Sequence, residues 1–312
     1  MAERAGASAS RSKRKPLPLL ARLRAWLSEA PAKPMPAPSV PRQARIRKEA
    51  AQEPASIPLS RMTVAQWLWG DGFIMPGDAD FVLELVKPFG LTPAMSMLDL
   101  SAGLGGPARA IAQAFGTYVT GLERSEERAK RGMEMSVAAD LAKRAAIAHY
   151  DPETVELRKN GFDCILGRGA LHTVVDKERL LRVLHVGLKQ KGQLLLNEFT
   201  SDPSAGERPE MAAWVARESY PPRLWTVSQY TDCLSGLGFD IRVIEDVSNL
   251  YRSMIVVGWA RMLQEVDLRA MSRKHRITVL DEAELWMHRI AALESGALRV
   301  FKIYALLNKP AR

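Results

Sequence analysis

Short apolar runs alternate with longer amphipathic segments from residue 62 to the end of the chain. The short runs are rich in Val, Ile and Leu, and the longer segments repeat apolar residues at helical spacing. Such alternation predicts an α/β fold with a parallel sheet. We expect seven strands at 96–100, 118–123, 146–149, 162–167, 193–199, 239–247 and 298–307.

The segments between these strands predict crossover helices on both faces of the sheet. We place them at 106–114, 125–142, 177–188 and 227–237. A helical pattern at about 248–297 separates the last two strands and is too long for a tight turn. We expect a helical insertion there that covers one end of the sheet as a lid.

Residues 1–60 lack this periodicity. They hold nine of the 19 prolines among Ala, Ser and Arg, a composition that buries too little apolar area to offset chain entropy. We therefore expect a disordered arm over 1–60 and one folded domain over 61–312.

One segment of the arm is amphipathic. Residues 19–27 place five apolar side chains on one face of a short helix, with two arginines pointing elsewhere. Three interpretations stay open: peripheral contact of residues 17–28 with an anionic membrane, a helix that is transient or docks on its own domain, and an organellar transit peptide.

The positive charge of the chain belongs to this arm. The whole sequence has 44 Lys and Arg against 35 Asp and Glu, and twelve of the bases but four of the acids lie in residues 1–60. The remainder holds 32 basic and 31 acidic side chains. A nearly neutral folded part argues against a basic groove for nucleic acid.

The two cysteines indicate a reducing compartment. Cys164 and Cys233 lie in apolar sequence without metal-ligand spacing, so we expect free thiols and no metal. No apolar run has the length of a spanning helix, and the N-terminus lacks the features of a signal peptide. We expect a cytoplasmic protein.

A glycine-rich turn follows the first predicted strand. The strand ends near Asp99, then come Gly103, Gly105 and Gly106, and Pro107 stands in the first turn of the next helix. Glycine lets the backbone approach a ligand and leaves the N–H groups of the helix N-terminus free. The pattern favours a nucleotide-type loop, with a plain strand-to-helix turn as the alternative.

Two further acids end the next two strands. Glu123 lies 18 positions after Gly105, where a carboxylate can accept both hydroxyls of a ribose. Asp151 follows the third strand, where it can accept from an adenine amino group. Because parallel strands end at one edge of the sheet, these two acids and Asp99 should converge on one crevice.

The chain from residue 62 onward resembles the class I S-adenosylmethionine-dependent methyltransferases. The similar segments are Leu98-Asp-Leu-Ser-Ala-Gly-Leu-Gly-Gly106, Gly121-Leu-Glu123, His149-Tyr-Asp151, Phe162-Asp-Cys-Ile-Leu-Gly167 and Leu188-Lys-Gln-Lys-Gly-Gln-Leu-Leu-Leu196. Ser101 stands where the family has its first glycine. The resemblance implies a seven-stranded Rossmann-like methyltransferase sheet, S-adenosylmethionine as cofactor, and cofactor contacts from Asp99, Ser101, Gly103, Gly105, Glu123, Asp151 and Arg168.

Two segments resemble, more narrowly, the phosphoethanolamine and related small-amine methyltransferases. They are Trp69-Gly-Asp-Gly-Phe-Ile-Met-Pro-Gly77 and Arg168-Gly-Ala-Leu-His172. In that group an Asp follows the arginine and a Tyr precedes the lid motif, where this chain has Gly169 and Ala65. The departures leave a related amine, a lipid or another small molecule as acceptor.

The chemistry of methyl transfer selects one histidine. A sulfonium methyl group is already electrophilic, so the enzyme mainly aligns an acceptor lone pair and excludes water. His172 follows the fourth strand and has a side chain that titrates near neutral pH. We expect it to be the catalytic group on the acceptor side; a histidine that only packs at this loop is the alternative.

Aromatic residues recur in the segments expected to border the crevice. Aromatic rings bind methylated ammonium groups through cation–π attraction, and helix-spaced aromatics also form plain core. We expect substrate contacts from Trp69, Phe73, Trp225 and Tyr251.

The sequence thus predicts methyl transfer from S-adenosylmethionine to a small-molecule acceptor, with N-methylation of an amine favoured. A nucleic-acid methyltransferase that uses the arm to bind phosphate is one alternative, which the near-neutral domain disfavours. A non-catalytic protein that only binds S-adenosylmethionine is the other.

Overall fold

The computed structural model describes residues 60–308. The predicted arm and its amphipathic segment at 17–28 lie outside these residues, apart from Ser60. Between residues 60 and 308 no helix is long and apolar enough to cross a membrane. The same stretch contains no group of three or more His, Cys, Asp or Glu side chains arranged to hold a metal ion.

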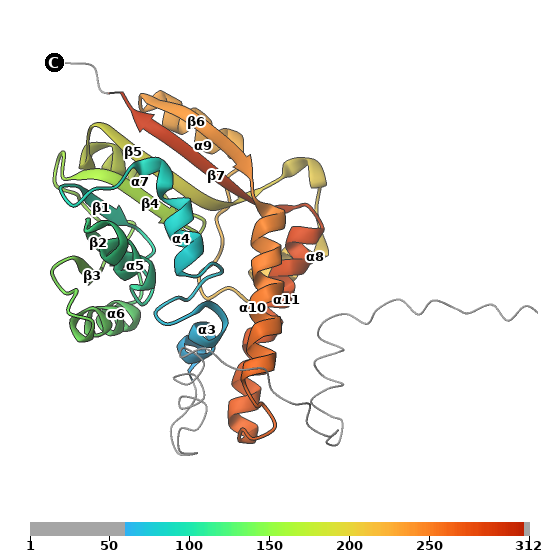
Figure 1. Ribbon diagram of the computed structural model, residues 1–312. Coiled ribbons are helices and arrows are strands. Elements are labelled where there is room, and N and C mark those ends of the chain that lie inside the picture. The colour runs from blue at the N-terminus through green and yellow to red at the C-terminus, as the bar shows by residue number, and fades with distance from the viewer. Residues whose placement is uncertain (1–59, 309–312) are drawn as a thin grey trace, which may run out of the picture. The chain divides into compact units, whose positions relative to one another are not determined.

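Seven strands form one sheet in the order β3-β2-β1-β4-β5-β7-β6, which confirms the predicted α/β class (Figure 1). The predicted strand positions agree with the structure except that β5 begins earlier and is longer than expected. The strands are β1 (Ser96–Asp99), β2 (Tyr118–Glu123), β3 (Ala145–His149), β4 (Phe162–Arg168), β5 (Leu188–Ser201), β6 (Phe239–Asp246) and β7 (Leu298–Leu307).

The prediction of a parallel sheet is correct for β1 to β5 and wrong for β7. Strand β7 runs antiparallel to both β5 and β6. Its first residue, Leu298, pairs with Ser201 at the end of β5. The two helices between β6 and β7 carry the chain away and back to the same end of the sheet, so β7 must run in the opposite direction.

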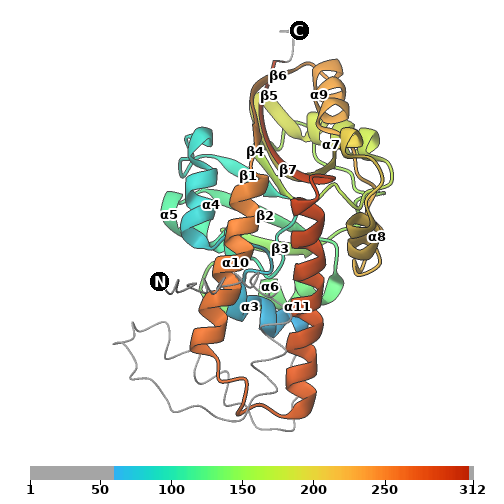
Figure 2. The ribbon, with the colours of Figure 1, turned by 90° about the vertical axis from the view of Figure 1, so that its right-hand side faces the viewer.

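Helices cover both faces of the sheet (Figure 2). On one face lie α7 and α9, whose leucines share a buried core with Leu98, Ile165 and Leu196. On the other lie α4, α5 and α6. The described helices are α3 (Arg61–Trp69), α4 (Ala79–Leu85), α5 (Gly106–Phe115), α6 (Glu126–Ala138), α7 (Lys177–Gly187), α8 (Pro209–Val215), α9 (Val227–Gly236), α10 (Ser248–Glu265) and α11 (Arg273–Glu294), with short 3₁₀ turns at η1 (Lys87–Phe89) and η2 (Pro203–Ala205).

Helices α10 and α11 form an antiparallel hairpin that packs on α3 (Figures 1 and 2). The Trp69 ring of α3 lies edge-on to Trp286 of α11, with 5.0 Å between ring centroids. Gly258 of α10 lies against the same Trp69 ring, so closely that a Cβ at this position would overlap it. The absence of a side chain at Gly258 therefore sets how near the hairpin comes to α3.

We expect Gly258→Ala to lower the free energy of unfolding by about 1–3 kcal/mol, because the added methyl forces Trp69 or the helix to move. Chemical denaturation measures this loss. The matched control is Gly236→Ala in α9, where a Cβ meets nothing within 4 Å. Equal effects of the two substitutions would show that α10 and α3 do not pack closely.

Candidate active site

The predicted site residues gather where the parallel strands end. Asp99, Glu123 and Arg168 are the last residues of β1, β2 and β4, and all three are buried. Strands β1, β2 and β4 are neighbours in the sheet. Their ends therefore bring the three side chains to one edge, where open α/β sheets bind ligands.

The glycine loop is held by the protein itself. Gly103 and Gly105 have φ values of 57° and 77°, in the left-handed region that glycine adopts without strain. A Cβ on Gly103 would lie 2.7 Å from Ile74, and one on Gly105 would lie 2.9 Å from Ile147. Both glycines are thus needed for backbone conformation and packing.

The amides of this loop are not free, contrary to our expectation. The Gly103 N–H donates to Glu123 Oε2 at 3.0 Å, and the Gly105 N–H donates to the Ala102 carbonyl at 2.7 Å. The Gly106 N–H donates to Gly72 at 3.0 Å. The segment 70–77, which sequence resemblance singled out, therefore closes directly over the glycine loop.

Asp99 has one carboxylate oxygen to spare. The side chain is fully buried, and Oδ1 accepts from the Ser101 N–H at 3.2 Å. Oδ2 makes no hydrogen bond within the described residues. Burial raises the pKa of Asp99 to about 6, against the hydrogen bond from Ser101 and the charge of Arg168. An unpaired buried acceptor is costly, and a ligand donor would satisfy it.

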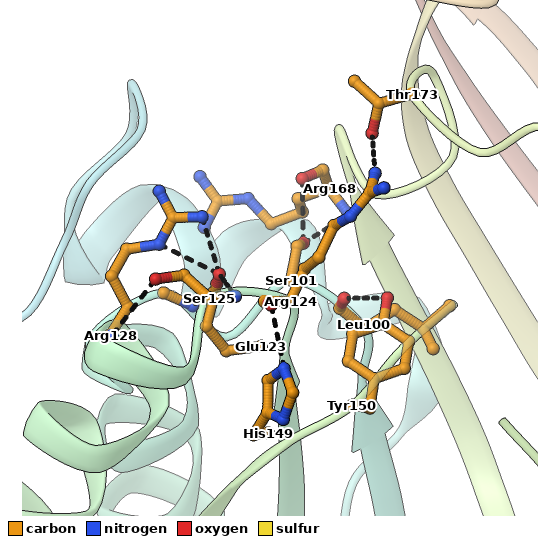
Figure 3. Close-up of polar contacts among 11 residues, drawn as sticks. Leu100, Ser101, Glu123, Arg124, Ser125, Arg128, His149, Tyr150, Arg168 and Thr173 are labelled. Atoms are coloured by element: carbon orange, nitrogen blue, oxygen red, sulfur yellow. Dashed lines mark hydrogen bonds and ion pairs between the residues drawn. The ribbon is translucent and has the colours of Figure 1, made fainter. Parts of the chain in front are cut away.

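The side chain of Ser101, which stands where the family has glycine, joins two parts of the structure. Its hydroxyl donates to the Arg168 carbonyl at 2.8 Å and accepts from the Arg168 N–H at 3.1 Å (Figure 3). The loop after β1 is thereby fastened to the end of β4. The hydroxyl proton is used within the protein, so the Ser101 side chain has no donor left for a ligand.

Glu123 is the most heavily used carboxylate of the site (Figure 3). Besides Gly103, it accepts from the Ser125 N–H at 2.9 Å. Arg128 of α6 donates to Oε1 through Nε at 2.9 Å and forms an ion pair through Nη2 at 2.7 Å. Sequence reasoning did not find Arg128, because nothing along the chain distinguishes it from its basic neighbours.

Asp151 lies on the surface beyond β3. Its carboxylate accepts from the Glu153 N–H at 3.0 Å and the Thr154 hydroxyl at 3.1 Å. The hydrogen bond from Glu153 holds the pKa of Asp151 below its usual range. Next to it, the buried Tyr150 hydroxyl donates to the Leu100 carbonyl at 2.9 Å, which joins the β3 end to the β1 end.

Arg168 is buried between β4 and the segment 70–77. Its Nη2 donates to the Pro76 carbonyl at 2.8 Å, and its Nε has no partner among the described residues. Asp99 lies near enough to interact with it electrostatically. Arg168 thus supports the segment that covers the glycine loop.

His172 lies half-buried in the turn after β4. Its ring meets Phe199 of β5 edge-on at 5.0 Å between centroids and lies beside the backbone of Gly169. Nδ1 makes no hydrogen bond within residues 60–308. Burial lowers the pKa of His172 to about 4, although Glu218 opposes the shift. The imidazole is therefore neutral at physiological pH.

A buried acid on β5 holds the turn that carries His172. Glu198 accepts from the Ala170 N–H at 2.7 Å and from the Leu171 N–H at 3.2 Å. Burial raises the pKa of Glu198 to about 7, while these backbone donors and Lys177 oppose the shift. Lys177 itself is buried and donates to the Val174 carbonyl at 2.7 Å.

His172 borders a cavity of about 320 Å³. The cavity lies between the end of the sheet and helices α3 and α11. Its walls include apolar and aromatic side chains together with three arginines and two acids. The lining includes Arg61, Ala65, Met75, Arg128, Gly169, His172, Thr173, Phe199, Glu218, Tyr220, Glu282, Trp286 and Arg289.

The charges of this cavity are paired. Arg289 forms a buried ion pair with Glu218 and stacks over the Phe199 ring at 5.4 Å. Arg61 pairs with Glu282 at 2.6 Å. Although burial opposes it, Arg289 holds the pKa of Glu218 below its usual range. These pairs join residues far apart in the sequence, so no local pattern could have revealed them.

The two departures from the amine methyltransferase pattern both lie in this cavity. Ala65 and Gly169 are part of its lining. Gly169 has φ of 59°, and a Cβ there would stand 3.0 Å from Met75. An Asp at this position would therefore need both a strained backbone and a shift of Met75.

The four predicted substrate aromatics do not line this cavity. Trp69 and Phe73 are buried, Trp69 against α10 and α11 and Phe73 near Gly70 and Gly106. Trp225 packs on Tyr230 at 5.2 Å between centroids. Tyr251 meets Phe199 at 5.3 Å and lines a separate cavity of about 580 Å³. Phe199, Tyr220 and Trp286 are the aromatics beside His172.

Known proteins match this chain over most of the described residues. A family model for mycolic acid cyclopropane synthetase matches residues 80–302. Phosphoethanolamine N-methyltransferase 2 of Caenorhabditis elegans is 26% identical over 193 residues, which are 61% of this chain and 43% of that protein. Glycine/sarcosine/dimethylglycine N-methyltransferase of Actinopolyspora halophila is 27% identical over 179 residues, 57% of this chain and 31% of that protein.

A solved structure shares the fold. Phosphoethanolamine N-methyltransferase 2 of Haemonchus contortus, in complex with phosphomonomethylethanolamine and S-adenosylhomocysteine, superposes with a TM-score of 0.70 at 22% identity. The match covers 80% of this chain and 57% of that one. The chain thus spans about half the length of these relatives or less. The family match over residues 80–302 shows that the chain belongs to the mycolic acid cyclopropane synthetase family of class I S-adenosylmethionine-dependent methyltransferases.

Proposed function

We propose that this protein transfers a methyl group from S-adenosylmethionine to the nitrogen of a small-molecule amine. The observation that carries the proposal is the placement of His172 and its cavity beside the strand ends that carry Asp99 and Glu123. Relatives named for amine N-methylation share about a quarter of their aligned residues with this chain.

The residues at the strand ends fit an adenosyl cofactor. Oδ2 of Asp99 is a buried acceptor without a partner, which suits the amino group of a methionine moiety. Glu123 offers a carboxylate to a ribose diol, and Asp151 lies at the end of β3, where adenine would be recognised. The backbone of Ser101, Gly103 and Gly105 forms the floor between them, and Arg168 keeps the segment 70–77 closed over it.

The cavity fits an acceptor that is small and partly apolar. When bound, S-adenosylmethionine supplies a methyl group on a positively charged sulfur, which is already electrophilic. The protein must then orient the acceptor nitrogen and exclude water. Phe199, Tyr220 and Trp286 supply aromatic surface to the cavity. An arginine already lies over each ring, Arg289 over Phe199 and Trp286 and Arg124 over Tyr220. Ile74 and Met75 of the segment 70–77 form part of the cavity wall.

His172 would act on the neutral amine as a hydrogen-bond acceptor. Because its pKa lies near 4, the imidazole keeps a lone pair at neutral pH. That lone pair can accept the N–H of the amine and aim the nitrogen lone pair at the methyl group. Glu198 holds the turn in which His172 lies through two backbone N–H groups.

We expect Glu123→Gln to weaken S-adenosylmethionine binding by roughly ten- to a hundredfold, the cost of about 1.5–3 kcal/mol for losing a charged acceptor to the ribose hydroxyls. Isothermal titration calorimetry measures the affinity. Glu134→Gln on the exposed side of α6, where Glu134 pairs with Arg131, is the matched control. Unchanged affinity in a folded Glu123→Gln variant would remove Glu123 from the ribose site.

We expect His172→Ala to reduce the methylation rate by about 10²-fold or more, with cofactor affinity retained. Rates are measured with ethanolamine phosphate, glycine and sarcosine as candidate acceptors. His288→Ala on α11, half-exposed beside Glu284, serves as control and should retain the rate. Equal losses of rate and cofactor affinity in His172→Ala would mean that His172 only supports the turn.

The pH dependence follows from the low pKa of His172. The folded protein keeps the ring neutral down to about pH 4, whereas an unperturbed imidazole has a pKa of about 6.5. Titration of His172 should therefore not reduce the wild-type rate between about pH 5.5 and 8. On unfolding, the ring regains its usual pKa and takes up a proton below about pH 6.5, so its contribution to stability falls as pH decreases toward 4. A rate inflection near pH 6.5 that disappears in His172→Ala would contradict the buried, neutral ring.

A further inference from the structure

The Glu123 carboxylate already accepts three hydrogen bonds and has one further ion-pair contact. Oε1 accepts from the Ser125 N–H at 2.9 Å and contacts both Nε and Nη2 of Arg128 at 2.9 and 2.7 Å. Oε2 accepts from the Gly103 N–H at 3.0 Å. A carboxylate offers about four lone-pair positions. Three of these positions accept hydrogen bonds from the protein, so one is left, on Oε2, where a ribose diol needs two.

The three hydrogen-bond donors differ in how easily they can leave. The N–H groups of Gly103 and Ser125 belong to the glycine loop and to the N-cap of α6, so moving them would disturb the backbone. Arg128 reaches Glu123 with a side chain that is 31% exposed. Its departure would free a position on Oε1 beside the one already open on Oε2, which together make the two that a 2′,3′-diol requires.

We propose that Arg128 occupies the ribose position of Glu123 in the cofactor-free protein and exchanges with the ribose hydroxyls when the cofactor binds. The inference rests on the proposed function, since it assumes an adenosyl ligand at Glu123. Arg128 thus competes with the cofactor for Glu123. Breaking the Arg128–Glu123 pair reduces the net free energy gained when the cofactor binds.

The freed guanidinium has a place to go. Arg128 also lines the cavity beside His172, together with Met75, Gly169 and Thr173. The other two arginines of that cavity keep their carboxylates, Arg289 with Glu218 and Arg61 with Glu282. The exchange therefore leaves one unpaired positive charge, that of Arg128, at the cavity beside His172 only when the cofactor is bound. Cofactor binding at Glu123 thus changes the electrostatics of that cavity.

The test compares two neutral nucleosides in two variants. Arg128→Met removes the competing guanidinium while keeping a long side chain. Arg131→Met, three residues along α6 in an exposed pair with Glu134, is the matched control. Adenosine carries the 2′,3′-diol and 2′,3′-dideoxyadenosine lacks it. Because neither ligand is charged, long-range repulsion by Arg128 does not contribute to the difference.

We expect Arg128→Met to bind adenosine about 3- to 10-fold more tightly than wild type, the range for release of a partly exposed ion pair. Affinity for dideoxyadenosine, measured in the same titrations, should not change, and Arg131→Met should match wild type for both. Rising salt should strengthen adenosine binding to wild type but not to Arg128→Met, since salt screens the pair.

Two results overturn the exchange. Weaker or unchanged adenosine binding in a folded Arg128→Met variant would make Arg128 a support for Glu123 or a bystander. Equal tightening for both nucleosides would make the effect independent of the diol. S-adenosylhomocysteine titrated into the same proteins separates this failure from that of the proposed function: if neither wild type nor Arg128→Met binds it, the cofactor assignment itself is wrong and the exchange falls with it.

Discussion

The site depends on the hydrogen bonds that Glu123 accepts at the end of β2. This carboxylate is 4% exposed, and a charge so placed is stable only with donors around it. The donors come from the glycine loop, from the start of α6 and from Arg128. One side chain thereby fixes the path of the loop after β1 and the start of the helix after β2. The hydrogen bonds to Glu123 therefore set the geometry of the crevice.

A second buried acid, Glu198 on β5, holds a turn in the same way. Glu198 is fully buried and accepts from the backbone of Ala170 and Leu171, which places His172 beside Phe199. In both cases a buried acid on a strand organises a turn through backbone N–H groups, so the turn is specified by the sheet. Asp99 differs, because it keeps an oxygen without a partner. Such a group costs stability unless a ligand or a water supplies the missing donor.

The sequence allowed the strands and the strand-end acids to be predicted, because both depend on local pattern. Apolar runs identify β1 to β5, and the topology of a parallel sheet brings Asp99 and Glu123 together. The direction of β7 was predicted wrongly, since it depends on where the α10–α11 hairpin returns the chain. Arg128 and Arg289 were missed for a related reason: an ion pair depends on tertiary distance, and neither arginine carries a local signal. Trp69 was assigned to substrate from its position in the motif, whereas packing against Trp286 and Gly258 draws it into the interior.

In the proposed reaction, the cavity beside His172 receives an amine whose nitrogen takes the methyl group. The most direct measurement supplies S-adenosylmethionine carrying a deuterated methyl group to the full-length protein together with a mixture of small-molecule metabolites, and follows the products by mass spectrometry. We expect a small product that bears the deuterated methyl on nitrogen and is absent with His172→Ala. Label found only on nucleic acid, or no labelled product while S-adenosylmethionine binds and small amines are present, would contradict it.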